Sequence, residues 1–331
     1  MLFKRTAYAL VAQLDRVFGY EPKGQGFESL RAHQNIPPTP VGGIFVFIPI
    51  IHDKTPKRER KVIMSSNEEQ IRALYADGER EESRAAQSRS AGMEFAYTMK
   101  TMEKHIQKTD RVLEVGCATG YYALRLAPLC REYVGVDLVP AHIDRLRENV
   151  RAAGLTNATG RVGDATQLGE IPDDSFDVVC CFGPLYHLPP EERELVFAEC
   201  RRVCRPGGVL AFAYICQIGV YAAACVHDTL RQFYPSKRAN EYVLGRGTDD
   251  FKPGVFFYTT PEEMEAAAKR HGLTKVSNLG LDFFLAASVI DAMSEETFAL
   301  YQPLADRMCA SEACTGMSNH ALLVCRKEAG G

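Results

Sequence analysis

The chain lacks the features that mark metal-binding, disulfide-rich, membrane and secreted proteins. None of its eleven cysteines stands in a Cys-x-x-Cys pair, so neither a metal site nor a disulfide framework is indicated. No apolar run approaches the roughly 20 residues that a membrane helix needs. The first residues are a poor signal peptide, because Asp15 and Arg16 interrupt their apolar stretch. We therefore expect a cytoplasmic protein with reduced, buried cysteines and no membrane contact.

A large excess of charge of one sign is missing as well. The formal net charge is −3 at pH 7, and 46% of the residues are hydrophobic, as in an ordinary globular protein. Wide contact with nucleic acid would favour a basic face. We therefore expect no nucleic-acid partner. The chain also contains no internal repeat.

The first 63 residues differ in character from the rest. Pro37-Pro38 and Gly42-Gly43 interrupt any helical or strand period. The segment from Gly26 to Arg31 resembles the translation of a tRNA gene. Met64 precedes capping residues and an acidic first helical turn, so it reads as a natural start. We expect residues 1–63 to be a non-native or disordered extension and residues 64–331, which are distinctly acidic, to form the domain.

Apolar runs alternate with helical stretches after about residue 110. This alternation predicts a doubly wound α/β sheet. The expected strands are Arg111–Val115, Tyr133–Val136, Thr159–Val162, Phe176–Phe182, Val209–Tyr214 and His320–Arg326. The expected helices are about Tyr121–Leu126, Ala141–Ala153, Pro190–Cys204, which Arg205-Pro206-Gly207-Gly208 ends, and Pro261–Arg270.

Two further segments are expected to cap this sheet. Residues 64–108 have a polar helical pattern, and residues 216–258 form an aromatic-rich insertion after the fifth strand. Ligands of open α/β sheets bind at the carboxyl edge of the strands. We therefore predict an N-terminal helical cap and a helical lid over that edge.

A glycine-bracketed turn follows the first strand. Gly116 and Gly120 enclose it, but this spacing alone also occurs in any tight turn between a strand and a helix. Two acids make the signal more specific: Glu114 precedes the turn, and Asp137 ends the next strand. A carboxylate at that position can accept both hydroxyls of a ribose. Ala118 stands where dinucleotide folds usually carry a further glycine, which disfavours NAD.

The third and fourth strands also end in candidate site residues. Asp164 either accepts from an adenine amino group or caps its own turn. His187 is the candidate general base, although it could equally cap the next turn or pack on a cofactor. Tyr186 beside it suits a wall of the site better than a catalyst. The remaining candidates read as structural or turn residues; they are His142, His320 and Cys117.

Five ordered motifs resemble those of the class I S-adenosylmethionine-dependent methyltransferases. They are Glu114-x-Gly116-x-x-x-Gly120, Asp137, Gly163-Asp164-Ala165, the strand from Phe176-Asp177, and Arg205-Pro206-Gly207-Gly208. The resemblance spans about residues 111–214. It implies a seven-stranded Rossmann-like sheet with one antiparallel strand near the C terminus, which His320–Arg326 fits, and S-adenosylmethionine as the cofactor.

The resemblance also implies which residues hold the cofactor. The methionine part would pass Gly116, Cys117 and Gly120 beside Glu114, the ribose would bind Asp137, the adenine would contact Leu138, Asp164 and Ala165, and the sulfonium would face Phe182 and Gly183.

A sulfonium is a strongly activated methyl donor, so transfer depends mainly on orientation and desolvation. A base matters only if the acceptor must lose a proton. We predict a methyltransferase acting on an O, N, S or C nucleophile of a small molecule, because the chain is acidic and lacks the Asn-Pro-Pro-aromatic motif of base- or amide-directed enzymes. The alternatives are an RNA or protein methyltransferase and a non-catalytic module that binds S-adenosylmethionine. The acceptor and the oligomeric state stay open at this point.

Overall fold

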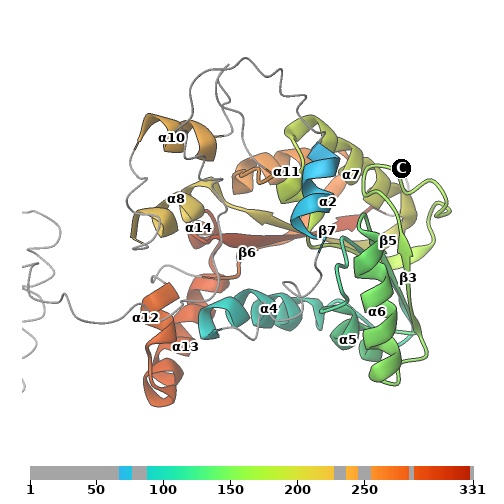
Figure 1. The fold of residues 1–331 in the computed structure, drawn as a ribbon, viewed down its shortest axis with the longest axis horizontal. Coiled ribbons are helices and arrows are strands. Elements are labelled where there is room, and N and C mark those ends of the chain that lie inside the picture. The colour runs from blue at the N-terminus through green and yellow to red at the C-terminus, as the bar shows by residue number, and fades with distance from the viewer. Residues whose placement is uncertain (1–66, 77–87, 227–235, 245–254, 283–286, 329–331) are drawn as a thin grey trace, which may run out of the picture. The chain divides into compact units, whose positions relative to one another are not determined.

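The computed structural model describes residues 67–76, 88–226, 236–244, 255–282 and 287–328 (Figure 1). All of them belong to the same compact unit of the chain. The expected extension over residues 1–63 and the expected start at Met64 lie outside these ranges. Within them, no helix is long and apolar enough to span a membrane.

A seven-stranded sheet with the order β3-β2-β1-β4-β5-β7-β6 forms the centre of the fold. Strands β1 to β5 are parallel, and β7 runs antiparallel to both β5 and β6. This arrangement confirms the doubly wound α/β prediction and the antiparallel strand near the C terminus. The strands are β1 (Arg111–Val115), β2 (Glu132–Asp137), β3 (Ala158–Val162), β4 (Phe176–Cys181), β5 (Cys204–Ile215), β6 (Leu273–Gly280) and β7 (His320–Lys327).

Helices cover both faces of this sheet (Figure 1). One core cluster packs α7 and α11 against the strands, and a second packs α4, α5 and α6 against the other face. The helices are α2 (Asn67–Leu74), α4 (Arg89–Met102), α5 (Ala123–Leu126), α6 (Pro140–Ala152), α7 (Pro190–Val203), α8 (Gln217–Val226), α10 (Lys237–Val243), α11 (Pro261–Arg270), α12 (Ala287–Asp291), α13 (Glu295–Cys309) and α14 (Glu312–Thr315), with 3-10 turns η3 (Ala127–Leu129) and η4 (Pro184–His187).

The helix expected over Pro190–Cys204 ends within one residue of its predicted end, but β5 already includes Arg205–Gly208, before the expected strand start at Val209. Helix α7 stops at Val203, and Cys204 pairs with Phe176 of β4. The register then shifts between the two strands, and Gly207 takes a φ of +76°. The proline-glycine sequence therefore follows the helix end and makes an irregular strand entry.

Helix α4 connects the N-terminal part of the fold to its C-terminal helices. The Arg89 guanidinium donates to the main-chain oxygen of Met293 at 2.6 Å, and the Tyr97 hydroxyl donates to Asp306 of α13 at 2.8 Å. Met93 packs in a separate apolar cluster with residues of α12 and α13. Segments about 200 residues apart in sequence therefore hold each other in place.

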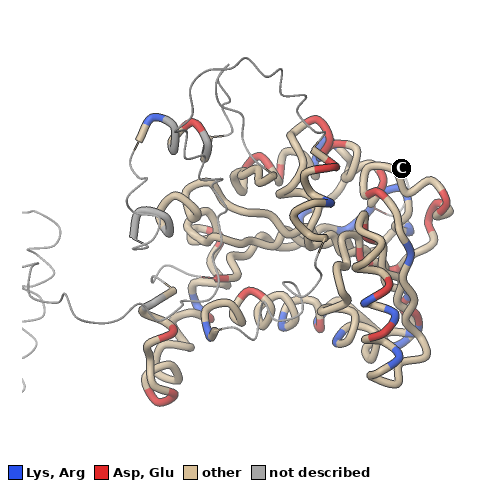
Figure 2. The backbone as a smooth tube through the Cα atoms, in the orientation of Figure 1, with Lys and Arg blue, Asp and Glu red and all other residues tan. Residues whose placement is uncertain are grey.

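Ten of the eleven cysteines have described side chains; these ten are free, and nine of them are buried. This confirms the expected use of cysteine as a small hydrophobic residue. Charged side chains are mixed on the exposed helix surfaces. On α6, Arg145 pairs with Glu148 and Arg147 pairs with Asp144, so acidic and basic residues intersperse (Figure 2).

Candidate functional site

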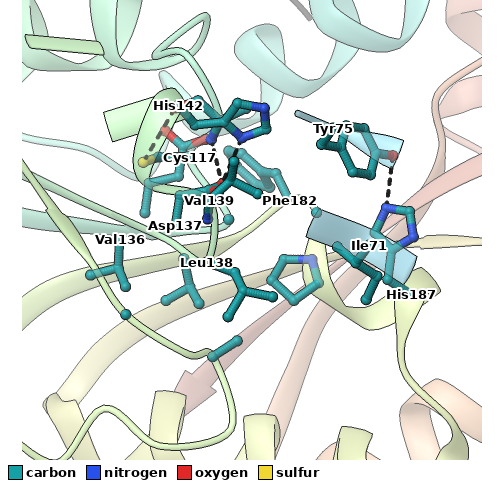
Figure 3. A pocket seen from close by; sticks show the side chains of 18 of the residues that line it. Ile71, Tyr75, Cys117, Val136, Asp137, Leu138, Val139, His142, Phe182 and His187 are labelled. Atoms are coloured by element: carbon teal, nitrogen blue, oxygen red, sulfur yellow. Dashed lines mark hydrogen bonds and ion pairs between the residues drawn. The ribbon is translucent and has the colours of Figure 1, made fainter. Parts of the chain in front are cut away.

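A pocket lies at the carboxyl edge of the parallel strands, where β1, β2 and β4 end (Figure 3). This edge contains the point at which the chain reverses its winding direction between β1 and β4, the usual ligand position of such folds. The pocket is lined by nine residues that were expected to hold a cofactor and by both catalytic candidates. They are Glu114, Gly116, Cys117, Asp137, Leu138, Asp164, Ala165, Phe182 and Gly183, with Tyr186 and His187.

Gly116 lies directly after β1 and is hydrogen-bonded to the end of β2. Its φ is +78°, and the main-chain N–H groups of Gly116 and Cys117 both donate to the Val136 oxygen, at 2.8 and 3.1 Å. A Cβ on Gly116 would lie only 2.4 Å from Cδ of Pro184. Glycine is therefore required both by the left-handed backbone and by the close packing of the β1 turn on the β4 turn.

Ala118 also adopts a left-handed conformation, with a φ of +43°. Glycine takes this conformation at no steric cost, which explains why related turns favour it here. The Ala118 N–H donates to Asp137 Oδ2 at 2.8 Å. The strand-end acid thus stabilises the strained turn across the pocket.

Asp137 accepts two further hydrogen bonds through Oδ1. The donors are the Val139 N–H at 2.9 Å and Nδ1 of His142 at 3.0 Å (Figure 3). A carboxylate has about four acceptor positions, so three donors leave about one for a ligand. His142, which the sequence presented as structural, therefore lies in the pocket wall and contacts the residue expected to bind ribose.

Glu114 lies buried beneath the turn, with 1% of its surface exposed. Burial raises the pKa of its carboxyl to about 8; the hydrogen bond from the Tyr133 hydroxyl lowers that pKa and the nearby Asp137 raises it. At neutral pH this carboxyl therefore holds a proton. The base of the pocket carries a neutral acid where the sequence suggests a charged one.

The surroundings of Cys117 and Gly120 indicate that both residues have structural roles. Burial raises the pKa of the Cys117 thiol well above its ordinary value, so the thiol stays protonated and is a poor nucleophile. Gly120 is absent from the pocket lining; its φ is +91°, and a Cβ there would lie 3.0 Å from Leu146 of α6. Gly120 therefore lets the turn close against α6.

Asp164 takes the second of the two roles considered for it, the cap of its own turn. Its Oδ1 accepts from the N–H and the hydroxyl of Thr166, at 2.8 and 2.9 Å, so it caps its own turn. It also lines the pocket beside Ala165. The cap fixes the carboxylate at the end of β3.

Both ring nitrogens of His187 have partners. Nδ1 lies 2.8 Å from the Val255 oxygen, and Nε2 lies 3.0 Å from the Tyr75 hydroxyl. The Tyr186 hydroxyl donates to the Phe182 oxygen at 3.1 Å, which suits a wall residue. His320 pairs with Asp282 at 2.7 Å, in keeping with a structural role.

Several pocket residues come from segments without a recognisable motif. Helix α2 contributes Ile71, the residue directly after α2 is Tyr75, and α4 contributes Glu94, which accepts from the Tyr122 hydroxyl at 2.7 Å. The Tyr122 ring lies 4.7 Å from that of Phe182. In the described ranges, no group of three or more His, Cys, Asp or Glu side chains is placed to hold a metal ion.

Comparisons with known proteins show that the central part of the chain is similar to methyltransferases. Residues 112–208 match the model of a methyltransferase domain. A protein-L-isoaspartate O-methyltransferase of Methanoculleus marisnigri is 41% identical over 85 residues, which cover 25% of this chain and 38% of the relative. A ubiquinone biosynthesis O-methyltransferase of Stutzerimonas stutzeri is 27% identical over 187 residues, which cover 55% of this chain and 72% of the relative.

The chain spans half or less of the length of four of the curated relatives that it matches. Among solved structures, it resembles a chain of the Haloferax volcanii complex that contains the Trm112 methyltransferase activator. The TM-score is 0.51 and the identity 17%, with 80% of this chain and 99% of that chain covered. This likeness shows a shared fold.

Proposed function

Because residues 112–208 belong to the methyltransferase domain family, whose cofactor is S-adenosylmethionine, we propose that this chain transfers the cofactor's methyl group to a small molecule. One observation carries the proposal. Asp137, at the end of β2, faces the glycine turn after β1 and is held 2.8 Å from its Ala118 N–H, inside the pocket at the carboxyl edge. This is the place and the residue type that bind a ribose in such folds.

The residues present fit this cofactor. Asp137 would accept the ribose hydroxyls, through its remaining acceptor position or by displacing His142. Gly116 and Cys117 would border the methionine part, and Leu138 and Asp164 the adenine. The bound cofactor supplies a methyl group on a positively charged sulfur. The chain itself contributes orientation and exclusion of water, the two effects on which transfer mainly depends.

The segments expected to cap the domain support a small acceptor. Helix α2 and the residue after it place Ile71 and Tyr75 in the pocket wall, and the Phe257 N–H donates to the Tyr186 oxygen at 2.8 Å. Aromatic rings of Tyr121, Tyr122 and Phe182 add an apolar wall. The name of the ubiquinone-pathway relative points to a small molecule as well.

A protein acceptor is the second candidate, because the name of the Methanoculleus relative describes methylation at L-isoaspartate in proteins. Incubation with S-adenosylmethionine labelled in its methyl group separates the two candidates. The probes are a deproteinised metabolite extract and the matching protein fraction. Label in the metabolites supports the proposal, and label in the protein fraction alone supports the alternative. Binding without transfer to either would describe a non-catalytic module.

Replacing Asp137 tests the cofactor assignment. Asp137→Asn removes the charge that strengthens hydrogen bonds from ribose hydroxyls, each worth about 1.5–3 kcal/mol. We expect the Kd for S-adenosylmethionine in isothermal titration calorimetry to rise by about 10-fold or more. Asp144→Asn is the matched control, because this exposed aspartate of α6 pairs with Arg147 away from the pocket.

Circular dichroism confirms that both variants fold. An unchanged Kd for Asp137→Asn would contradict the role of Asp137. Failure of the unaltered chain to bind S-adenosylmethionine would overturn the proposed function.

A further inference from the structure

Tyr75 and His187 form a hydrogen-bonded pair in the pocket wall, although 112 positions separate them in sequence. The Tyr75 hydroxyl lies 3.0 Å from Nε2 of His187, and the two rings meet edge to face with centroids 5.3 Å apart (Figure 3). Both side chains line the pocket that holds Asp137 and Phe182. Neither belongs to the glycine turn or to the acids that mark the cofactor site.

The partner of the other ring nitrogen determines the direction of this hydrogen bond. Nδ1 of His187 lies 2.8 Å from the main-chain oxygen of Val255, which can only accept. Nδ1 must therefore carry the proton. In the neutral imidazole, Nε2 is then the acceptor, and the Tyr75 hydroxyl donates to it.

This arrangement changes how His187 can act as a base. Its basic nitrogen faces the Tyr75 hydroxyl, so a proton from an acceptor molecule reaches it most directly through that hydroxyl. The Tyr75 oxygen keeps lone pairs that can accept a hydrogen bond while its own hydrogen points to Nε2. In enzymes that activate a hydroxyl group, the hydroxyl is hydrogen-bonded to an imidazole, and a third group orients that imidazole. Here the Val255 carbonyl is the orienting group.

We propose that Tyr75 is a catalytic residue that passes the proton of the methyl acceptor to His187, an inference that rests on the proposed function. The bond between hydrogen and the acceptor's nucleophilic atom breaks, and its electron pair stays on that atom for attack on the methyl group. The proton goes to the Tyr75 oxygen as the Tyr75 proton goes to Nε2. Tyr75 stays neutral, and His187 becomes an imidazolium whose Nδ1–H still donates to Val255.

Helix α2 places Tyr75 by two additional contacts. The Asn67 amide donates to the His187 main-chain oxygen at 2.8 Å, and the Arg72 guanidinium donates to the Leu138 oxygen at 2.5 Å. The helix thus contacts the end of β2 and the turn after β4 at once. Asn67 provides a matched control, since it holds the same helix to the same histidine without touching the ring nitrogens.

The first readout is the tautomer of His187, measured by nitrogen-15 NMR on the full chain with labelled histidine. Signals lost in His187→Gln identify the ring. We expect a protonated Nδ1 and an unprotonated Nε2. Tyr75→Phe, which keeps the aromatic ring, should shift the Nε2 signal, whereas Asn67→Ala should leave the tautomer and that shift unchanged.

The second readout is methyl transfer into the deproteinised extract, together with the Kd for S-adenosylmethionine. Proton-transfer groups contribute about 10²–10⁴-fold. We expect Tyr75→Phe to lower kcat at least about 10²-fold with the Kd within about threefold.

A protonated Nε2 in the unaltered chain, or a full kcat in Tyr75→Phe, would overturn the relay and leave the proposed function intact. An equal loss of cofactor affinity in Tyr75→Phe and Asn67→Ala, without a separate loss of kcat, would show that Tyr75 only anchors α2. An unaltered chain that binds no S-adenosylmethionine would instead refute the proposed function.

Discussion

Replacing Glu114 by glutamine should stabilise the protein in mildly alkaline solution and have little effect in acid. The pKa of this buried carboxyl is about 8 in the folded chain and 4.5 where it is unperturbed. Because the folded-state pKa is raised, the stability contributed by the protonated group is fully present below pH 4.5 and is lost as pH rises through 8. Glutamine keeps the shape of the protonated side chain and does not titrate.

The size of the effect follows from the difference between the two pKa values. Between pH 4.5 and pH 8, each rise of one pH unit lowers the free energy of unfolding by about 1.4 kcal/mol. Over the whole window the loss amounts to about 3–5 kcal/mol once relaxation around the buried group is allowed for. The free energy of unfolding of Glu114→Gln minus that of the unaltered protein should therefore grow by this amount from pH 5 to pH 8 and level off above.

Urea unfolding followed by circular dichroism at several pH values measures this difference. The chain contains no tryptophan, so circular dichroism suits it better than fluorescence. Glu170→Gln is the control, because Glu170 is exposed and its substitution should leave the difference flat. A flat difference for Glu114→Gln as well would refute the reasoning, since it would mean that Glu114 ionises alike in the folded and unfolded chains.

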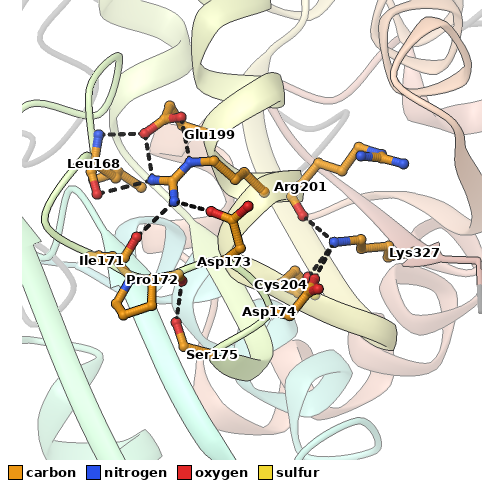
Figure 4. A network of polar contacts seen from close by, with 11 residues as sticks. Leu168, Ile171, Pro172, Asp173, Asp174, Ser175, Glu199, Arg201, Cys204 and Lys327 are labelled. Atoms are coloured by element: carbon orange, nitrogen blue, oxygen red, sulfur yellow. Dashed lines mark hydrogen bonds and ion pairs between the residues drawn. The ribbon is translucent and has the colours of Figure 1, made fainter.

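Two further predictions concern packing and the contacts of a buried lysine. Gly219→Ala should lower the melting temperature in thermal scans by about 6–12 °C, since overpacking against backbone costs about 3 kcal/mol. The new Cβ would lie 1.8 Å from the main-chain oxygen of Ser318. The control is Gly169→Ala, which has open space around its Cβ and should leave the melting temperature unchanged. Lys327→Met removes a buried ammonium that donates to one carboxylate and to two main-chain oxygens near the end of α7 (Figure 4). Its urea midpoint should fall by the equivalent of about 1–3 kcal/mol, and a midpoint equal to that of the exposed control Lys269→Met would contradict the role of the network.

Strands β1, β2 and β4 could be predicted because they are almost entirely buried and their sequences are apolar runs. Edge strand β6 has no such signal, since polar residues interrupt its apolar pattern at positions 274–275 and 277–278. Helix α13 escaped notice for a related reason: Pro303 lies inside it, and proline normally argues against a helix interior.

The same difference divides the candidate site. Gly116 and Asp137 could be found because a strand, a turn and the next strand bring them together over a short stretch of sequence. Tyr75 could not, because only tertiary packing of α2 brings it to His187. His142 lay close to Asp137 in sequence, but its ring direction depends on where α6 begins. Site residues that lie close together in sequence could therefore be predicted, whereas partners that only tertiary packing brings together could not.

The buried thiols give the protein a built-in set of probes for its own opening. Cys180 and Cys181 are neighbours on β4, yet one packs in the cluster beneath α5 and α6 and the other in the cluster beneath α7 and α11. An alkylating reagent reaches such thiols only when the covering layer opens. Labelling of two adjacent residues, read by peptide mass spectrometry, therefore reports separately how often each face of the same strand becomes exposed.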